Sequence, residues 1–300
     1  MKIGDRSIGP GHPCYIIAEV GINHNGSLEI AKRLLQAAAD ANVDAVKLQK
    51  RLLPRAVPSA MRDTPKVLQD GTTTTYLAYK EGLEFSIEQY KELYDLAHSL
   101  GLDFGASVWD TVSPHALTDS FVVDFLKLPS ATIADEPIVH HTATRGVPFF
   151  WSTGMYEMGQ IGRTAEWLDE YGFDNWGVFH CNSSYPAKPE ELNLRVIAEW
   201  SDYTMFRGHP IGYSGHEVGL ATTVAAVALG ANMVERHITL DRSSWGSDHA
   251  SSVEPQGFAR LVSDIRAVES AMGDGKKVVW PSEESKKNSL VVKTYLTTPS

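Results

Sequence analysis

Tyr213-Ser-Gly-His216 ends one short apolar run of the chain, and Val234-Glu-Arg-His237 ends the next. Six earlier apolar runs have the same design, with polar and reactive residues at the point where each run stops. Such a repeat is typical of a (β/α)₈ TIM barrel, in which all strand ends meet at one mouth. The eight predicted strands cover residues 15–21, 45–49, 103–109, 125–129, 148–154, 176–181, 211–214 and 234–237.

The segments between these strands predict the helices and the limits of the barrel. Ser27 and the capping box Ser86-Ile-Glu-Gln89 begin two helices, and Pro255 begins a last helix that Gly273 ends. Further helices are expected near residues 113–121, 134–145, 189–200 and 218–229. The polar stretch 51–85 is too long for a plain connector and is expected to form a lid or wall over the site.

We therefore expect one α/β domain with short additions at both ends. A hairpin over residues 1–14 closes the bottom of the barrel, the barrel covers residues 15–273, and a tail over residues 274–300 lies on it. The chain has 300 residues, of which 43% are hydrophobic, so it can bury one large core.

Composition excludes several classes of function. The net charge of -10 argues against a surface that binds nucleic acid, because such surfaces carry clustered lysine and arginine. No apolar run reaches the length of a membrane span, and the first residues do not form a secretory signal. The two cysteines, Cys14 and Cys181, lie far apart in sequence and fit a reducing compartment. We expect a cytoplasmic protein with neither a nucleic-acid nor a membrane partner.

The polar residues at the predicted mouth form one candidate site. Lys47 and Lys127 together with several serines suit a phosphate or carboxylate ligand, because lysine supplies positive charge and serine donates hydrogen bonds. A lysine in a strand can instead reach solvent, but unpaired ammonium groups inside apolar strands are costly, which favours the ligand site. The set comprises Glu19, Lys47, Gln49, Ser107, Lys127, Ser130, Ser152, Ser183, Tyr185, Ser214, His216 and His237.

Two histidines in this set suggest a metal. His216 and His237 end neighbouring strands, so their imidazoles can converge on a divalent ion whose other positions water fills. The alternative is that each is a hydrogen-bonded core histidine. Asp248, in a Gly- and Ser-rich loop, is a candidate to bind the substrate or the metal shell, although such an Asp also forms turns.

Several motifs in the same order resemble the sialic acid synthase family, over nearly the whole chain. Members are (β/α)₈ enzymes that condense phosphoenolpyruvate with an aldehyde sugar, such as N-acetylmannosamine, to give a 2-keto-3-deoxy sugar acid and phosphate. The motifs are Ala18-Glu-Val-Gly-Ile-Asn-His-Asn-Gly26, Val46-Lys-Leu-Gln49, Trp151-Ser-Thr-Gly-Met155, His180-Cys181 with Tyr185-Pro186, Gly212-Tyr-Ser-Gly-His216 and Val234-Glu-Arg-His-Ile-Thr239.

The resemblance implies a role for each residue of the candidate site. His216 and His237 would bind the metal, commonly Mn²⁺ or Mg²⁺. Glu19 is the candidate to position or deprotonate a water molecule, and its alternative role is a salt bridge to Lys47 or Lys127. Together with Glu19, the residues facing the reacting centre and the sugar would be Gln49, Tyr185 and Asp248. Phosphoenolpyruvate would be surrounded by Lys47, Ser107, Lys127, Ser130, Ser152, Ser183 and Ser214.

Three departures from the family concern the acceptor side. Thr132 stands where the family has a glutamate that binds the amino sugar, and Ser183 stands where it has an asparagine, for which Asn182 is expected to compensate. We also expect that the acceptor pocket is built without the family's C-terminal antifreeze-like domain, which in the family completes that pocket across a dimer. We expect a different acceptor, or a homodimer or separate protein that completes the pocket. A metal-dependent aldolase or lyase and a non-catalytic sugar-acid-binding protein remain as alternatives.

Overall fold

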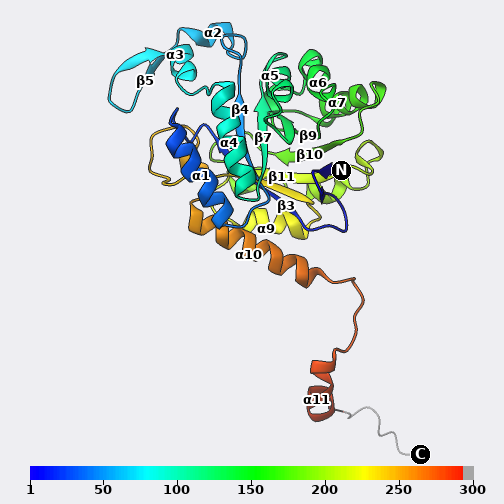
Figure 1. The fold of residues 1–300 in the computed structure, drawn as a ribbon. Coiled ribbons are helices and arrows are strands. Elements are labelled where there is room, and N and C mark those ends of the chain that lie inside the picture. Colours follow the sequence, from blue (N-terminus) through cyan, green and yellow to red (C-terminus); the bar gives the residue numbers. More distant parts are fainter. Residues whose placement is uncertain (293–300) are drawn as a thin grey trace, which may run out of the picture.

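Eight parallel strands close into a barrel in the computed structural model, which describes residues 1–292 (Figure 1). The predicted (β/α)₈ fold is confirmed. Neighbouring strands follow one another in sequence order around the barrel, and the last pairs with the first. The strands are β3 (Tyr15–Gly21), β4 (Ala45–Lys50), β7 (Asp103–Val108), β8 (Phe125–Leu128), β9 (Phe149–Ser152), β10 (Trp176–Cys181), β11 (Ile211–Gly215) and β12 (Met233–His237).

Helices surround the barrel and begin largely where the sequence indicated. Ser27 accepts a hydrogen bond from the Ile30 amide at the first of them, and Ser86 and Gln89 form the expected capping box. Gly273, with φ of 62°, ends the last helix. The outer helices are α1 (Leu28–Asp40), α4 (Ile87–Ser99), α5 (Ser113–Asp119), α6 (Glu136–Ala143), α7 (Met158–Glu170), α8 (Arg195–Trp200), α9 (Ala221–Ala228) and α10 (Pro255–Met272).

Two helices differ from the sequence prediction. Helix α7 was not predicted, and the helix expected over residues 189–200 is reduced to α8, after a short 3₁₀ turn, η2 (Pro189–Glu191). Asn193 has a φ of 44°, in the left-handed region, so a continuous α-helix cannot pass through it.

The end of the barrel opposite the mouth is filled by apolar side chains. The N-terminal hairpin of β1 (Lys2–Ile3) and β2 (Arg6–Ser7) places Ile3 and Ile8 in one buried cluster with Phe125, Phe150 and Phe179 of the strands. The interior below the mouth is therefore a packed core, and the open space of the barrel lies at its carboxyl end.

Residues 51–85 form a small structured excursion beside the mouth, drawn in cyan in Figure 1. It contains α2 (Ser59–Arg62), the hairpin of β5 (Pro65–Val67) and β6 (Thr73–Thr75), and α3 (Tyr76–Glu81). Its Tyr79 meets Trp245 edge-on at 5.5 Å between ring centroids, which joins the excursion to the loop after β12.

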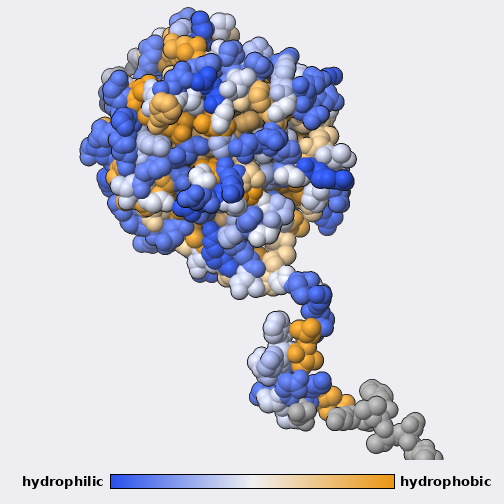
Figure 2. Space-filling view, turned by 45° about the vertical axis from the view of Figure 1, so that its right-hand side comes forward, coloured by the Kyte–Doolittle hydropathy of each residue, from blue (hydrophilic) through white to orange (hydrophobic). Residues whose placement is uncertain are grey.

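The C-terminal segment departs from our expectation of a tail lying on the barrel. Helix α11 (Pro281–Leu290) stands away from the barrel in Figure 1. Trp280 is 64% exposed, and Figure 2 shows apolar residues on this segment facing outward. Residues 293–300 of the expected tail lie outside the described residues. Within residues 1–292, no helix combines the length and apolar character that crossing a bilayer requires.

His24 couples the excursion to the barrel in a way that depends on its protonation. Its ring stacks on Phe85 at 4.2 Å, and its Nδ1 accepts a hydrogen bond from the Gly26 amide at 3.1 Å. Burial, aided by Arg51, lowers the pKa of His24 to about 4. The folded state therefore holds His24 neutral, whereas the unfolded chain protonates it as the pH falls below its ordinary pKa of 6.5.

We predict that this difference makes the protein less stable as the pH falls from neutrality towards the folded pKa. Between about pH 7.5 and about pH 5, wild type should lose roughly 2 kcal/mol more free energy of unfolding than His24→Gln does. Urea unfolding at the two pH values measures this. His12→Gln, at an exposed position, should follow wild type; equal pH slopes for His24→Gln and wild type would show that His24 does not titrate on unfolding.

Candidate active site

A cavity of about 210 Å³ opens at the carboxyl ends of the strands, and it gathers nearly all the predicted site residues. Of the predicted set, only Asp248 does not line it. Trp109, Pro129, Ala131, Met155, Cys181 and Glu235 also line it, although the sequence analysis gave them no role. The predicted residues in its wall are Glu19, Lys47, Gln49, Ser107, Lys127, Ser130, Ser152, Ser183, Tyr185, Ser214, His216 and His237.

Four charged side chains pair at the floor of this cavity, and we call them the charge quartet. Lys47 Nζ lies 2.5 Å from Glu19 Oε2, and Lys127 Nζ lies 2.7 Å from Glu235 Oε1. Lys47 Nζ also lies 3.8 Å from Glu235 Oε2, which links the two pairs. All four side chains are at most 5% exposed. The salt bridge named as the alternative role of Glu19 is therefore present.

Glu235 is the functional residue that the sequence analysis missed. Side chains two apart on a strand share a face, so the assignment of His237 to the mouth already placed Glu235 inside the barrel. Burial alone would raise the pKa of Glu235, but the ammonium groups of Lys127 and Lys47 outweigh it and hold this pKa below its usual range. Burial lowers the pKa of Lys127, and the Glu235 carboxylate opposes that shift.

Gln49 connects the quartet to the upper wall of the cavity. Its Nε2 donates to Glu19 Oε1 at 2.9 Å, and its Oε1 accepts a hydrogen bond from Arg51. The Arg51 guanidinium in turn lies 4.4 Å from the centre of the Trp109 ring. Glu19 is therefore held in one orientation from two sides, by Lys47 and by Gln49.

The serines bring hydroxyl groups to the same space. Ser107 accepts from Lys47 Nζ at 2.6 Å, and Ser130 accepts from the Gly154 amide at 3.0 Å. Ser152 is buried, and its Oγ has no hydrogen-bond partner among the described residues. A Cβ on Gly154 would lie 2.1 Å from Ser183 Oγ, so only glycine lets these serines approach.

His216 and His237 lie together on one side of the cavity, with ring centroids 5.5 Å apart. His216 Nδ1 lies 2.7 Å from the Asn182 carbonyl oxygen, which can only accept, so the proton sits on Nδ1 and Nε2 carries a lone pair. Burial, and then His237, lower the pKa of His216 to about 3. His237 Nδ1 is buried without a hydrogen-bond partner in the described part of the chain.

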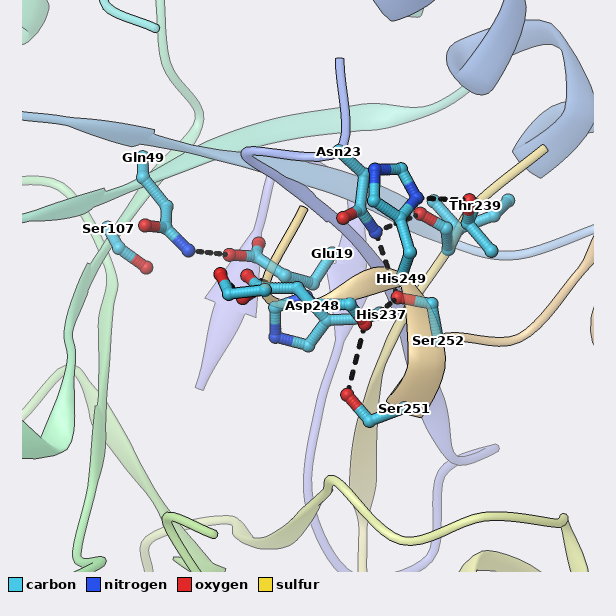
Figure 3. A network of polar contacts seen from close by, with 12 residues as sticks. Glu19, Asn23, Gln49, Ser107, His237, Thr239, Asp248, His249, Ser251 and Ser252 are labelled. Atoms are coloured by element: carbon cyan, nitrogen blue, oxygen red, sulfur yellow. Dashed lines mark hydrogen bonds and ion pairs between the residues drawn. The ribbon is translucent and has the colours of Figure 1, made fainter. Parts of the chain in front are cut away.

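Asp248 reaches the site from the loop after β12. Its Oδ2 lies 3.6 Å from His237 Nδ1. Figure 3 shows the polar contacts that fix this loop: Asp248 accepts at its backbone carbonyl from the hydroxyls of Ser251 and Ser252, and Asn23 donates to Ser252 Oγ at 2.8 Å. Burial alone would raise the pKa of Asp248, but His237 and the Ser247 hydroxyl outweigh it and lower this pKa.

Tyr185 covers the histidines from the outside. Its ring centroid lies 4.1 Å from that of His216, and the side chain is 46% exposed at the mouth. Burial of its hydroxyl group raises the pKa of Tyr185 well above its ordinary value, so the hydroxyl remains a hydrogen-bond donor at neutral pH.

The expectation that Asn182 compensates on the acceptor side needs correction, and Thr132 lies outside the cavity wall. Thr132 is buried and its Oγ1 donates to the Pro129 carbonyl at 3.0 Å, so Ala131 and not Thr132 lines the cavity. Asn182 cannot compensate for the asparagine missing at Ser183, because its side chain donates to the Glu191 carbonyl and accepts from the Ser184 amide.

The chain is similar to known proteins over most of its length. A protein-family model described as the NeuB family matches residues 34–277. The chain belongs to the NeuB family. N-acetylneuraminate-9-phosphate synthase from Mus musculus is 40% identical over 93% of this chain and 76% of that protein. N,N'-diacetyllegionaminic acid synthase from Legionella pneumophila is 34% identical over 91% of this chain and 77% of that protein.

A solved structure supports the same assignment. N-acetylneuraminic acid synthetase from Leptospira borgpetersenii, in complex with citrate, superposes with a TM-score of 0.83 at 28% identity. The match covers 97% of this chain and 96% of that one. This NeuB-family chain is therefore an enzyme of the sialic acid synthase type, and the non-catalytic alternative is set aside.

We predict that breaking one pair of the charge quartet destabilises the NeuB-family fold. Lys127→Met leaves the Glu235 carboxylate buried with only the more distant Lys47, which should lower the free energy of unfolding by roughly 3 kcal/mol. Adding Glu235→Met removes the unpaired carboxylate and should restore most of the lost free energy of unfolding. Urea unfolding of both variants measures this. A double variant less stable than Lys127→Met would show that the two side chains do not compensate each other.

Proposed function

We propose that this enzyme condenses phosphoenolpyruvate with an aldehyde sugar, giving a 2-keto-3-deoxy sugar acid and phosphate, with Mn²⁺ or Mg²⁺ bound at His216 and His237. One observation carries the proposal: two buried lysines and five serines converge in the cavity that also holds both histidines. The similarity to synthases of N-acetylneuraminate 9-phosphate and N,N'-diacetyllegionaminic acid supports it.

The floor of the cavity suits the phosphate and carboxylate of phosphoenolpyruvate. Lys47 and Lys127 would donate hydrogen bonds both to the substrate and to their glutamate partners, since an ammonium group has three N–H donors. The Ser152 hydroxyl, which has no hydrogen-bond partner among the described residues, can donate a further bond. A pyruvate aldolase would need no group for a departing phosphate, so this donor set favours the synthase over the aldolase or lyase.

The two histidines have the chemistry that a divalent cation needs. His216 presents a lone pair at Nε2, and the buried Nδ1 of His237 has no hydrogen-bond partner in the part of the chain that the structure describes. No set of three His, Cys, Asp or Glu side chains within residues 1–292 is arranged to hold a metal alone. An ion bound by these two histidines would have other positions for water and the aldehyde oxygen, and would act there as a Lewis acid.

In the proposed reaction, the enol carbon of phosphoenolpyruvate forms a bond to the aldehyde carbon of the sugar. The aldehyde oxygen becomes a hydroxyl by taking up the proton that the attacking water releases to Glu19. Water adds to the cationic carbon that carries the phosphate, and Glu19, held by Lys47 and Gln49, positions this water and receives its proton. The hydroxyl on that carbon then gives its proton to the phosphate as the carbon–oxygen bond to phosphate breaks, leaving the keto acid, while Lys47 and Lys127 stabilise the departing charge.

The acceptor sugar would lie above this floor. Tyr185 offers a hydroxyl donor at the mouth, and Asp248 offers an ionised carboxylate beside His237. Both can bind sugar hydroxyl groups, one as donor and the other as acceptor.

The proposal predicts phosphate release that requires phosphoenolpyruvate, an aldehyde sugar and a divalent metal. Purified protein with Mn²⁺ should release phosphate with one or more members of a panel of hexosamines, hexoses and pentoses, and a chelator should stop it. His237→Ala should abolish turnover while the protein stays folded, whereas His98→Ala, at the exposed end of α4, should not.

Full activity of His237→Ala without added metal would contradict the metal assignment. Binding of phosphoenolpyruvate without release for any aldehyde would point to a missing protein partner or an acceptor outside the panel. Absence of binding would contradict the proposed substrate and favour the aldolase or lyase.

A second prediction isolates one contact to phosphoenolpyruvate. Ser152→Ala removes a hydroxyl that has no hydrogen-bond partner among residues 1–292, so the free energy of unfolding should stay unchanged. The KM for phosphoenolpyruvate should rise roughly tenfold, because one bond to a charged ligand is lost. Steady-state kinetics and urea unfolding measure both quantities. Ser120→Ala, at an exposed position after α5, is the control, and an unchanged KM in Ser152→Ala would remove Ser152 from the site.

A further inference from the structure

Lys66 and Lys80 meet three aromatic rings beside the mouth, and we call these five residues the lysine–aromatic cluster: Lys66, Tyr76, Tyr79, Lys80 and Trp245. Lys66 Nζ lies 5.1 Å from the centre of the Tyr79 ring and 5.6 Å from that of Trp245. Lys80 Nζ lies 5.3 Å from the centre of Tyr76 and 5.4 Å from that of Tyr79. The two ammonium groups therefore lie around one ring, that of Tyr79.

Neither ammonium group has a carboxylate within ion-pair distance among residues 1–292, although both side chains are partly buried. The nearby Glu84 is already engaged, since it pairs with Lys50 at 3.4 Å and with Arg51 at 3.4 Å. Burial, and then Arg51, lower the pKa of Lys80 to about 8, against the opposing effects of Asp248 and Glu84. Two positive charges thus lie near one ring, and neither forms an ion pair with a carboxylate among residues 1–292, an arrangement that favours an anionic ligand.

The cluster adjoins the acceptor side of the site. Trp245 belongs to the same loop as Asp248, whose carboxylate lies 3.6 Å from His237. On the other side, Arg51 influences Lys80 and bonds to Gln49, which lines the cavity. The lysines are therefore near the reacting centre, but they come from the excursion and not from the strands that bind phosphoenolpyruvate.

We propose that the lysine–aromatic cluster binds a phosphate ester on the acceptor sugar, at the end remote from its aldehyde. This inference rests on the proposed function. The reaction adds three carbons at the aldehyde end, so a phosphate on the last carbon of a six-carbon acceptor becomes a phosphate on the last carbon of a nine-carbon product. The mouse relative is named for such a product, N-acetylneuraminate 9-phosphate. A phosphate monoester carries up to two negative charges, which two separate ammonium groups can meet.

A purely structural role for the cluster makes a different prediction. If the lysines only stabilise the excursion through their contacts with the rings, replacing them lowers stability and slows the enzyme equally with every acceptor. A phosphate site instead changes the preference between acceptors that differ only in the phosphate.

The test compares N-acetylmannosamine with N-acetylmannosamine 6-phosphate, using the full chain, phosphoenolpyruvate and Mn²⁺. We measure kcat/KM for each acceptor by phosphate release and the binding of each acceptor by calorimetry. The variants are Lys66→Met, Lys80→Met and Lys80→Arg, with Lys91→Met as the control for loss of one charge at an exposed position on α4. Thermal unfolding of each variant verifies that it is folded.

Wild type should prefer the phosphorylated acceptor by roughly a hundredfold, and each methionine variant should reduce this preference roughly tenfold. The KM for phosphoenolpyruvate and the kcat/KM for the plain sugar should not change. Lys80→Arg should keep most of the preference, and Lys91→Met all of it. Equal use of the two acceptors by wild type, or a preference that the methionine variants leave intact, overturns the inference while the proposed function stands.

Calorimetry separates failure of the inference from failure of the proposed function. If neither acceptor releases phosphate, tighter binding of the phosphorylated sugar, weakened in Lys66→Met and Lys80→Met, still supports the cluster as a phosphate site. Equal binding of both sugars overturns it.

Discussion

Four opposite charges held inside an apolar barrel are the constraint on which the rest of the site depends. Taking a carboxylate or an ammonium group out of water costs several kcal/mol unless it is paired in good geometry. The strand register supplies that geometry, because it places Glu19 beside Lys47 and beside His237, and Ser214 beside Glu235. If the pairing register of a strand that carries one of these charges shifted by one residue, the charged side chain would face the packed layer between strands and helices. Pairing within the quartet therefore fixes the register as well as the site.

The outer side of β12 carries a further ion pair, outside the charge quartet, that supports the arrangement of the site. Arg236 is 1% exposed, and its Nη1 lies 3.1 Å from Glu217 Oε1. Glu217 also accepts from the Tyr213 hydroxyl at 2.9 Å. Because Glu217 follows His216 and Arg236 precedes His237, this pair joins the backbones that carry the two histidines. The Arg236–Glu217 pair on the outer face of the barrel thus helps to fix the separation of the two histidines, in addition to the contacts within the cavity.

The strands and most of the cavity wall could be predicted from the sequence. In this fold, inward-facing residues at the carboxyl ends of the strands all line one mouth. Glu235 was not predicted although its position on the strand placed it inside, because residue type alone does not distinguish a buried, paired glutamate from a solvated one. Helix α7 was missed because Gly159 and Gly162 in its first turns weaken the helical signal. The side-chain directions of Thr132 and Asn182 depend on short-range bonds to backbone groups, which residue type alone does not reveal. Trp109 enters the wall through its contact with Arg51, a partner far away in sequence.

The two halves of the site differ in how they are built, and this difference bears on substrate choice. Lys47, Lys127 and the serines come from strand ends or from short turns directly after them, so changing their positions would disturb the barrel. Asp248 and the lysine–aromatic cluster come instead from the loop after β12 and from the excursion 51–85. The loop after β12 is tied to the loop after β3 by bonds such as that from Asn25 to the Trp245 carbonyl at 2.9 Å. Loops on a rigid scaffold can change without loss of the core. In the proposed reaction, the step that all acceptors share would thus be carried by the barrel. The contacts that distinguish one acceptor from another would come from segments that can vary independently of it.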